Sequence, residues 1–454
     1  MQTILPLHGT PIPISQAFVT ARHDQSTWRC SLHRIKRVQS NPFGWLRAFG
    51  LIVLMLEVGG CAQFRLAAVP AADTHRASVL GIPNARFFAN DTAALVSESR
   101  NLKDRAAKYY ASIGRPLPPA NVLAISGGGD NGAFGAGLLV GWSESGKRPS
   151  FNAVTGISTG AMIAPFAFLG PEYDQVLAGM FTTIDQRDVF EKRLLLAAFG
   201  SDALEDTTPL KNMIAQYLDQ RIVERIAEEY RHGRSLVIIT TDLDAGLPVI
   251  WNIGAIAESG RLEAVTLIRQ ILLASAAIPG AFPPVMFDVT VDGVNYQEMH
   301  VDGGTTQQTF LYPPTLSLRA LPGAGPRRPH TAYIIRNAKL TDDWSEVKRT
   351  TLSIASRAVS TLIISSGTAD LYGFYAALKR DGADFRLGFI GDDFTAPHPD
   401  EFDHTYMTKL FEYGRAKARA GYPWRIGPPG FLTKPVNLSA YTAAGQLNHV
   451  ERSQ

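Results

Sequence analysis

The chain has 454 residues, with 44 Lys and Arg against 41 Asp and Glu, which gives a formal net charge of +3. Hydrophobic residues make up 45% and charged residues only 19%, so the chain can bury a large core and is not a disordered polyampholyte. So small a net charge excludes a dominant field for binding nucleic acid. Two cysteines, Cys30 and Cys61, exclude a disulfide framework and a Cys-rich zinc module, and no two histidines have the HxxxH spacing of a zinc peptidase.

The first sixty residues resemble an export leader. A basic cluster at residues 33–37 precedes an apolar segment at residues 45–56. That segment is shorter than the ~20 apolar residues that cross a bilayer, and the order of basic and then apolar residues is typical of a signal peptide. It ends in Val58-Gly59-Gly60-Cys61, which resembles the lipobox of bacterial lipoproteins, where the cysteine is lipidated.

This leader predicts that residues 1–60 are removed and that Cys61 anchors the protein to the bacterial cell envelope, in the outer membrane. Lipidation of Cys61 would leave the folded part without a free thiol, which suits an oxidising compartment. The charged Glu57 and the long polar start are atypical of a signal, so an uncleaved anchor and a short buried helix stay open as alternatives.

Residues 61–120 form a polar lead-in that favours helix and ends in a proline-rich linker at residues 115–119. Beyond it, short apolar runs alternate with helical patterns, which indicates an α/β fold with a mainly parallel sheet. We expect a core domain at residues 121–310 and a C-terminal α/β extension, residues 311–454, that packs on it. The predicted strands are 122–125, 153–155, 236–240, 249–251, 285–291, 294–299 and 332–336. The predicted helices are 133–144, 159–169, 209–231, 266–276, 347–365 and 404–420.

A glycine-rich loop follows the first of these strands. It reads Ser126-Gly127-Gly128-Gly129-Asp130-Asn131-Gly132 and leads into a helix. Consecutive glycines leave backbone N–H groups accessible, and the N-terminus of the helix adds a positive dipole end, so the loop predicts an anion site. Read literally, it is also a GxGxxG dinucleotide fingerprint. That motif needs an acidic residue at the end of the next strand, and none is present, so we expect no nucleotide partner.

The second motif is Gly156-Ile157-Ser158-Thr159-Gly160, a GxSxG sequence between a strand and a helix. A tight strand-to-helix turn presents the hydroxyl of its serine above the sheet edge and requires small residues on both sides. The dipole of the following helix favours negative charge that develops beside the serine. We therefore predict that Ser158 is a nucleophile; a helix N-cap is its structural alternative.

The third motif, Val301-Asp302-Gly303-Gly304, supplies the candidate base. A serine hydroxyl is a weak nucleophile until a base accepts its proton. Asp302 ends a predicted strand and is followed by two glycines, so its carboxylate can be presented at the sheet edge. In an α/β-hydrolase the base would be a histidine, and the downstream candidates are His300, His330, His398, His404 and His449.

These motifs resemble, in order and type, those of the patatin-like phospholipases. The apolar block 274–284, which ends in two prolines, and the segments 241–246 and 251–252 add to the resemblance, which covers residues 121–310. It implies a three-layer α/β/α fold and a lipid acyl hydrolase of the phospholipase A or lysophospholipase type. It implies that Ser158 and Asp302 form a catalytic dyad and that Gly127, Gly128 and Gly129 form the oxyanion hole. The remaining motif glycines that it marks are Gly132, Gly156, Gly160 and Gly303.

The resemblance also implies a phospholipid or other acyl-ester substrate, a membrane surface as partner, and no metal or other cofactor. No DxDxDG calcium loop occurs in the chain. The apolar segments 161–169 and 194–199 are candidates for the acyl pocket. One departure stands out: Asn131 occupies a position where the family often has a cation. Two alternatives remain, a Ser-His-Asp carboxylesterase and a catalytically weak lipid-binding lipoprotein.

Overall fold

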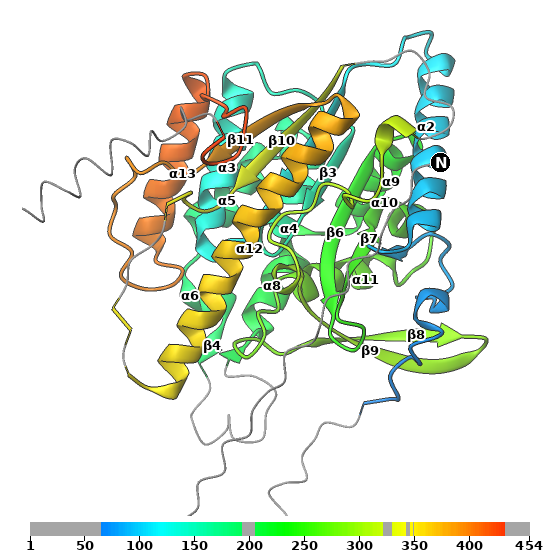
Figure 1. Ribbon diagram of the computed structural model, residues 1–454, viewed down its shortest axis with the longest axis horizontal. Helices are drawn as coiled ribbons and strands as arrows, with labels where there is room; N and C mark the ends of the chain where they lie inside the picture. The colour runs from blue at the N-terminus through cyan, green and yellow to red at the C-terminus, as the bar shows by residue number, and fades with distance from the viewer. Residues whose placement is uncertain (1–64, 193–204, 321–328, 342–345, 348, 432–454) are drawn as a thin grey trace, which may run out of the picture. The chain divides into compact units, whose positions relative to one another are not determined.

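The computed structural model describes residues 65–192, 205–320, 329–341, 346–347 and 349–431 (Figure 1). The leader, Cys61, His449 and the segment 194–199 lie outside the described residues, so the predictions made for them are not tested here. In the part of the chain that the structure describes, no helix is both long and apolar enough to cross a membrane.

Nine strands of the described residues form one sheet, in the order β1-β7-β6-β3-β2-β10-β11, with β9 added to β6 and β8 added to β9. The central strands β6, β3, β2, β10 and β11 run parallel, whereas β7, β1, β8 and β9 join through antiparallel pairs. The strands are β1 (Arg86–Phe88), β2 (Ala120–Ile125), β3 (Ala153–Gly156), β6 (Ser235–Asp242), β7 (Leu247–Asn252), β8 (Val285–Val291), β9 (Val294–Asp302), β10 (His330–Arg336) and β11 (Asp384–Phe389). A separate short pair consists of β4 (Glu191–Lys192) and β5 (Glu205–Asp206).

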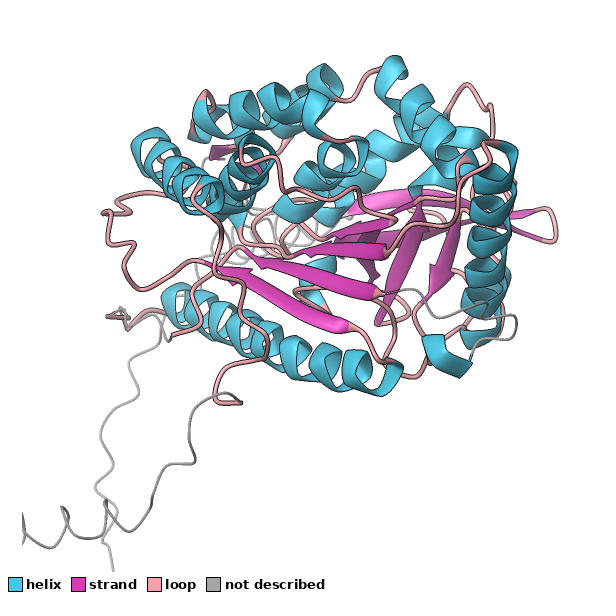
Figure 2. Ribbon diagram, turned by 90° about the horizontal axis from the view of Figure 1, so that it is seen from above, coloured by secondary structure: helices cyan, strands magenta, loops and turns pink. Residues whose placement is uncertain are grey.

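Helices cover both faces of the sheet (Figure 2), which confirms the predicted α/β fold with a mainly parallel central sheet. Most of them pack into one large core on one face, while α12 covers β2, β10 and β11 on the other. The helices are α2 (Thr92–Ser112), α3 (Gly132–Glu144), α4 (Thr159–Leu169), α5 (Asp174–Thr182), α6 (Gln186–Val189), α8 (Thr208–Tyr217), α9 (Gln220–Arg231), α10 (Ile253–Glu258), α11 (Ala264–Ser275), α12 (Thr351–Asp381) and α13 (His404–Arg419). The 3₁₀ turns are η1 (Thr74–Arg76), η2 (Gly129–Asn131), η3 (Pro171–Tyr173), η4 (Gly303–Thr305) and η5 (Leu318–Ala320).

The sheet draws on both ends of the described chain. β1, a strand the sequence did not predict, pairs antiparallel with β7 at one edge. At the other edge, β10 lies between β2 and β11 and is parallel to both, so residues beyond 310 complete the same sheet. Antiparallel pairs with β7 and β9 flank β6, and the predicted Asp292-Gly293 hairpin is confirmed by positive φ angles of 50° and 84°.

The prediction of one helix over residues 209–231 is wrong, because the segment breaks into α8 and α9. Asp219 starts the second helix by accepting a 3.0 Å hydrogen bond from the N–H of Ile222. The guanidinium of Arg269 donates to the carbonyls of Ala215 and Leu218, each at 2.9 Å. The carbonyl groups at the C-terminal end of α8, which have no partner within the helix, therefore accept hydrogen bonds from a side chain distant in sequence. Hydrophobic periodicity does not reveal such a contact.

α3 and α13 pack backbone against backbone through glycines. A Cβ placed on Gly137 would lie 2.0 Å from the carbonyl oxygen of Phe411, and one on Gly141 would lie 2.0 Å from that of Arg415. Because these neighbours are backbone atoms of a helix, they cannot rotate away. The close approach of these two helices therefore requires glycine at both positions.

We expect Gly137→Ala to lower the free energy of unfolding by about 3 kcal/mol, because an added methyl forces the two helices apart. Urea denaturation measures this change. Gly179→Ala is the matched control, since it also lies in a helix but its Cβ would meet only the Tyr217 hydroxyl at 3.9 Å. The control should be neutral or stabilising. Equal effects of the two substitutions would contradict the packing argument.

Candidate active site

Ser158 occupies a strained turn between β3 and α4. Its φ and ψ are 54° and −124°, a conformation that costs a non-glycine residue about 1–3 kcal/mol. A Cβ on Gly156 would lie 2.4 Å from the carbonyl oxygen of Gly160, and one on Gly160 would lie 2.3 Å from that of Ile125. Both motif positions therefore exclude any larger residue, as the GxSxG sequence predicts.

A second serine, Ser275, holds this turn in place by hydrogen bonds. Ser275, the last residue of α11, is fully buried, and its hydroxyl accepts a 3.0 Å hydrogen bond from the N–H of Ser158. The same hydroxyl donates to the carbonyl of Ile239 at 2.7 Å, which ties the turn to β6. Ser275 lies in the block 274–284, which the sequence marked only through the family resemblance.

Asp302 reaches Ser158 because β9 continues where β3 ends. The last pair between β3 and β6 joins Gly156 to Ile238, and two residues farther along β6 Thr240 pairs with Asp302. The end of β9 thus lies directly beyond the end of β3, which is the place where the turn presents Ser158. A Cβ on Gly303 would lie 2.6 Å from the carbonyl oxygen of Ile239, so only glycine fits immediately after Asp302.

The carboxyl group of Asp302 is buried and faces Ser158. It accepts a 2.7 Å hydrogen bond from the N–H of Gly304, and its backbone N–H donates to the carbonyl of Ala277 at 2.8 Å. Burial raises the pKa of Asp302 to about 7, although interactions with the Ser158 hydroxyl and the Gly304 N–H oppose the rise. A carboxyl group with this pKa can accept a proton near neutral pH.

The glycine loop lies against Ser158. A Cβ on Gly127 would lie 3.1 Å from the Cβ of Ser158. The Gly127 N–H donates to the carbonyl of Gln308 at 3.1 Å, so in this structure it is not available as the oxyanion donor that the resemblance implies. Gly128 and Gly129 have positive φ angles of 154° and 58°, and neither N–H has an acceptor among the residues that the structure describes. These two groups are the donors that the loop offers.

Asn337, which the sequence analysis missed, holds the loop in place. It is fully buried just beyond β10, where its N–H donates to the Ser126 hydroxyl and its side-chain amide to the Ser126 carbonyl, each at 2.9 Å. Its side-chain oxygen accepts from the N–H of Gly135 at 3.1 Å. Gly132 completes the fit, since its Cβ would lie 2.1 Å from the Thr159 hydroxyl oxygen. No local motif surrounds Asn337, so only its place in the sheet reveals this role.

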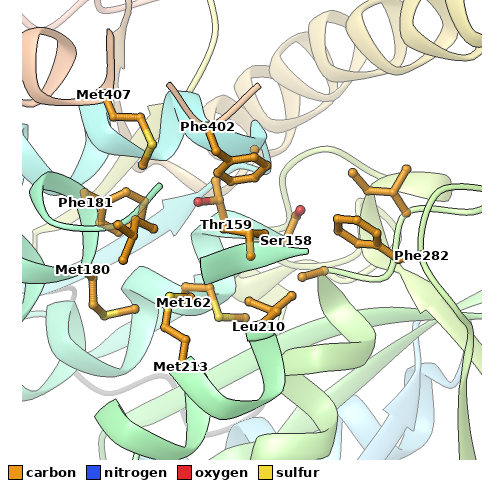
Figure 3. Close-up of a pocket in the computed structure, with 15 residues that line it drawn as sticks. Ser158, Thr159, Met162, Met180, Phe181, Leu210, Met213, Phe282, Phe402 and Met407 are labelled. Atoms are coloured by element: carbon orange, nitrogen blue, oxygen red, sulfur yellow. The ribbon is translucent and has the colours of Figure 1, made fainter. Parts of the chain in front are cut away.

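An apolar pocket opens beside Ser158 (Figure 3). Of the two predicted lining segments, 161–169 contributes one residue, Met162, while the other walls come from the ends of the glycine loop and β3, from α5, α6 and α8, from the segment after α11 and from residues 402–407. The pocket is lined by Gly129, Ser158, Thr159, Met162, Met180, Phe181, Ile184, Val189, Leu210, Met213, Ala276, Ile278, Phe282, Phe402 and Met407. Flexible methionines and aromatic rings suit a long, unbranched apolar ligand.

None of the described candidate histidines pairs with Ser158. His300 is fully buried and bonds Thr240 and Glu298, at 2.8 and 3.2 Å. His398 bonds Asp130 at 2.6 Å, and His404 donates to the Thr182 carbonyl at 2.7 Å. His330 begins β10, opposite Ala120, and so lies at the other end of the parallel strands from the nucleophile. The geometry around Ser158 offers Asp302 as its base.

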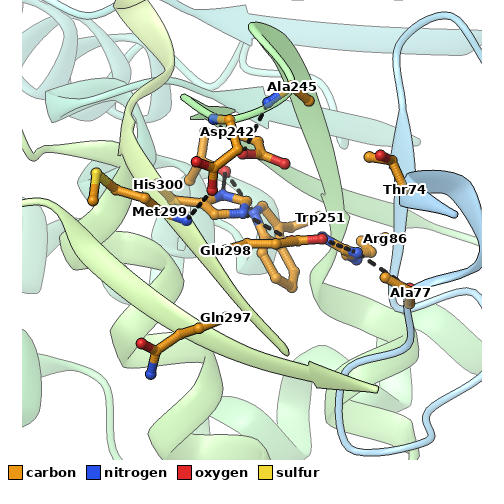
Figure 4. A network of polar contacts seen from close by, with 12 residues as sticks. Thr74, Ala77, Arg86, Asp242, Ala245, Trp251, Gln297, Glu298, Met299 and His300 are labelled. Atoms are coloured by element: carbon orange, nitrogen blue, oxygen red, sulfur yellow. Dashed lines mark hydrogen bonds and ion pairs between the residues drawn. The ribbon is translucent and has the colours of Figure 1, made fainter. Parts of the chain in front are cut away.

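One buried polar network lies behind the site (Figure 4). Asp242, Glu298 and His300 lie within reach of one another, which is the pattern of a metal site. Glu298, however, forms a two-pronged ion pair with Arg86 of β1, and both ring nitrogens of His300 have partners. Burial alone would raise the pKa of Glu298, but His300 and Arg86 lower it on balance. The network therefore fits an internal ion pair that ties β1 to the strand carrying Asp302.

Three comparisons show which known proteins this chain is similar to. The model of the patatin-like phospholipase family matches residues 123–313, the segment that contains the glycine loop, Ser158 and Asp302. Among solved structures, VipD from Legionella pneumophila is similar with 12% identity and a TM-score of 0.33, over 67% of each chain. Human GIVD cytosolic phospholipase A2 is similar with 11% identity and a TM-score of 0.24, over 61% of this chain and 51% of that one. No curated protein matches the chain. The segment that holds the candidate site is thus the one that matches the patatin-like phospholipase model.

Proposed function

We propose that this chain is a lipid acyl hydrolase that uses Ser158 and Asp302 as a dyad and passes through an acyl-enzyme. The observation that carries the proposal is the position of a strained serine, facing a buried carboxyl group, at the opening of an apolar pocket. The family model matched by residues 123–313 supports it independently.

In the first step Asp302 accepts the proton of the Ser158 hydroxyl as the oxygen attacks the acyl carbonyl. The turn at Ser158 already holds the side chain toward Asp302. Reaching the transition state therefore costs little further conformational entropy. Ser275 and Ile239 keep the turn in place. The proton on Asp302 then passes to the leaving alcohol or lysolipid.

The negative charge that develops on the carbonyl oxygen needs donors. The N–H groups of Gly128 and Gly129 are free to provide them, and the N-terminus of α4 adds its dipole beside Ser158. Asn131 adds no charge here, because its amide is neutral; its side-chain oxygen accepts a 2.6 Å hydrogen bond from the Tyr406 hydroxyl. Charge stabilisation in this proposal therefore rests on backbone groups.

The acyl chain would lie in the apolar pocket. Water would attack the acyl-Ser158 ester, with Asp302 accepting a proton from the water and returning it to the Ser158 oxygen as the acyl bond breaks, which restores the starting state. We further propose that the leader and a lipidated Cys61 hold the enzyme at the membrane surface of the bacterial envelope where its phospholipid substrate lies. A lipid anchor would raise the local concentration of such a substrate.

The proposal is tested by fatty-acid release from micellar phospholipid, combined with labelling by a serine-directed fluorophosphonate. We expect release without added metal, and a covalent adduct that mass spectrometry maps to Ser158. Release that persists while the adduct maps to another serine would contradict the site. A folded protein that neither releases fatty acid nor takes up the label would favour the lipid-binding alternative.

The pH dependence follows from the pKa of Asp302, which burial raises to about 7. The base must be ionised to accept the serine proton, so we expect kcat/KM to rise with pH through about pH 7. The measurement is a pH profile on a soluble ester that does not itself ionise. An acid limb near pH 4, the range of an ordinary carboxylate, would contradict the buried environment assigned to Asp302.

A further inference from the structure

A C-terminal segment outside the matched residues 123–313 reaches the glycine loop. Asp130, which directly follows Gly129, is buried, and one of its carboxylate oxygens accepts two hydrogen bonds. The Nε2 of His398 lies 2.6 Å from this oxygen, and the N–H of Phe402 donates to it at 2.9 Å. The loop before α13 is thus fastened to the residue next to a proposed oxyanion donor.

The same segment forms part of the apolar pocket. Phe402 points into the pocket beside Ser158 (Figure 3). Its φ of 57° is unusual for a phenylalanine and persists only where surrounding contacts hold it. The ring of Phe190 contacts those of both Phe402 and Phe282, with centroid distances of 6.0 and 5.6 Å. Three aromatic rings from distant parts of the chain therefore meet at this side of the pocket.

We propose that His398 is a positioning residue, which orders the oxyanion loop through Asp130, and that Phe402 is a specificity residue, which forms a wall of the acyl pocket. This inference rests on the proposed function and deepens it, because it assigns the choice of acyl chain to a residue outside the matched segment. The ligand class is an apolar acyl chain, since the wall is apolar and aromatic.

We call the contact between His398 and Asp130 the brace. It acts by fixing the orientation of the backbone in the glycine loop. Asp130 and Asn131 belong to the 3₁₀ turn that begins at Gly129, so fixing their side chains fixes the peptide planes of the loop. Tyr406 fastens the second of them through its 2.6 Å bond to Asn131, and its ring stacks on that of His398 at 4.0 Å. An oxyanion donor displaced by a fraction of an ångström loses much of its effect.

The charge of His398 strengthens the brace. Its hydrogen bond with Asp130 raises the pKa of His398, and the negative charges of Glu401 and Asp403 add to the rise, while partial burial opposes it. Below this raised pKa the pair is an ion pair; above it, neutral His398 can still donate to the Asp130 carboxylate, but the attraction between opposite charges is lost. The brace is therefore firm at lower pH and weakens as pH rises.

The first experiment compares His398→Ala and His398→Gln on p-nitrophenyl butyrate and palmitate. We expect His398→Ala to lower kcat about tenfold on both esters with KM nearly unchanged, because the donors lose their alignment. His398→Gln keeps an uncharged donor, so kcat should fall only about threefold. In the wild type, kcat should decline as pH rises through the raised pKa of His398, and this decline should be absent in His398→Gln. His404→Gln, which replaces the histidine bonded to Thr182, is the control and should leave kcat and the profile unchanged.

The second experiment concerns Phe402→Ala. Removing the ring enlarges the pocket, so we expect kcat/KM on the palmitate ester to fall about tenfold while the butyrate ester changes less than twofold. Phe431→Ala is its control, because Phe431 is exposed, packs against Tyr375 with a ring-centroid distance of 5.1 Å, and does not line the pocket. A change in chain-length preference with the control, or none with Phe402→Ala, would overturn the assignment of this wall.

Two measurements decide the proposal even without turnover. NMR titration of His398 should give a pKa above 6.5 that falls in Asp130→Asn. In the Ser158→Ala background, Phe402→Ala should weaken binding of the fluorescent fatty acid cis-parinaric acid about fivefold. If the wild-type chain hydrolyses no ester but both results hold, the proposed function fails. The contact of His398 with Asp130 and the role of Phe402 as a wall of the pocket are then still supported. If the chain is active and neither holds, only the present inference fails.

Discussion

Replacing Ser158 by alanine is expected to lower kcat on phospholipid by a factor on the order of 10⁶, because the reaction then lacks the atom that forms the acyl-enzyme. Substrate binding should persist, since the pocket walls other than this side chain are unchanged. The measurement is fatty-acid release from micelles, with binding of a non-hydrolysable ether lipid as the check on the pocket. Activity above one per cent of wild type would exclude Ser158 as the nucleophile.

Ser158→Gly separates loss of the nucleophile from loss of structure. Glycine adopts positive φ without steric cost, whereas alanine at this position keeps the strained 54° conformation. Both variants should be equally inactive, but the glycine variant should be more stable than the alanine variant by about 1 kcal/mol. Equal stability would mean that the backbone at this turn relaxes when the serine is replaced.

Asp302→Asn is expected to lower kcat by about 10²–10⁴, because an amide keeps the geometry of the carboxyl group but cannot accept the serine proton. Asparagine retains an oxygen for the 2.7 Å bond from Gly304, so the turn after β9 should persist. Fatty-acid release as a function of pH checks the prediction, and the limb near pH 7 should vanish with the carboxyl group. Wild-type activity in this variant would transfer the role of base to another residue.

Although Asp302→Asn is expected to lose activity, we expect it to be more stable than the wild type above neutral pH. The folded pKa of Asp302, about 7, lies above its ordinary value of 3.8, so the folded state binds the proton more tightly. The free energy of unfolding of the wild type therefore declines as pH rises between these two values. Asp302→Asn has no such charge to bury, and at about pH 8 its melting temperature should exceed that of the wild type by a few degrees. Asp244→Asn, at a partly exposed carboxylate, is the control.

Local patterns were sufficient to predict the strand-to-helix turn that carries Ser158, the proposed nucleophile. The turn at Ser158 requires glycine two residues before and two residues after it, and these requirements are visible in five consecutive letters. Buried parallel strands appear as short apolar runs, so β2 and β3 were predicted within a few residues. Asp302 could be proposed as the candidate base because it ends a predicted strand and precedes two glycines. These neighbours indicate a carboxylate presented at the edge of the sheet.

Long-range contacts explain what the sequence could not show. Arg269 ends α8 by binding carbonyls more than fifty residues away, and Asn337 fastens a loop two hundred residues earlier in the chain. The family resemblance implies that Gly127 is an oxyanion donor, whereas in the structure its N–H donates to the carbonyl of Gln308. In each case the deciding partner is a backbone group, which carries no sequence signal of its own.

The sequence by itself determined the α/β class, the strand-to-helix turn at Ser158 and the candidate dyad, because each depends on the size and polarity of neighbouring residues. Only the tertiary structure decided which N–H groups remain free, which side chains brace the loop, and which residues surround the pocket. Phe402 and Ser158 lie far apart in the chain and side by side in space, and the pairing of parallel strands together with the packing of α13 on α3 brings them there.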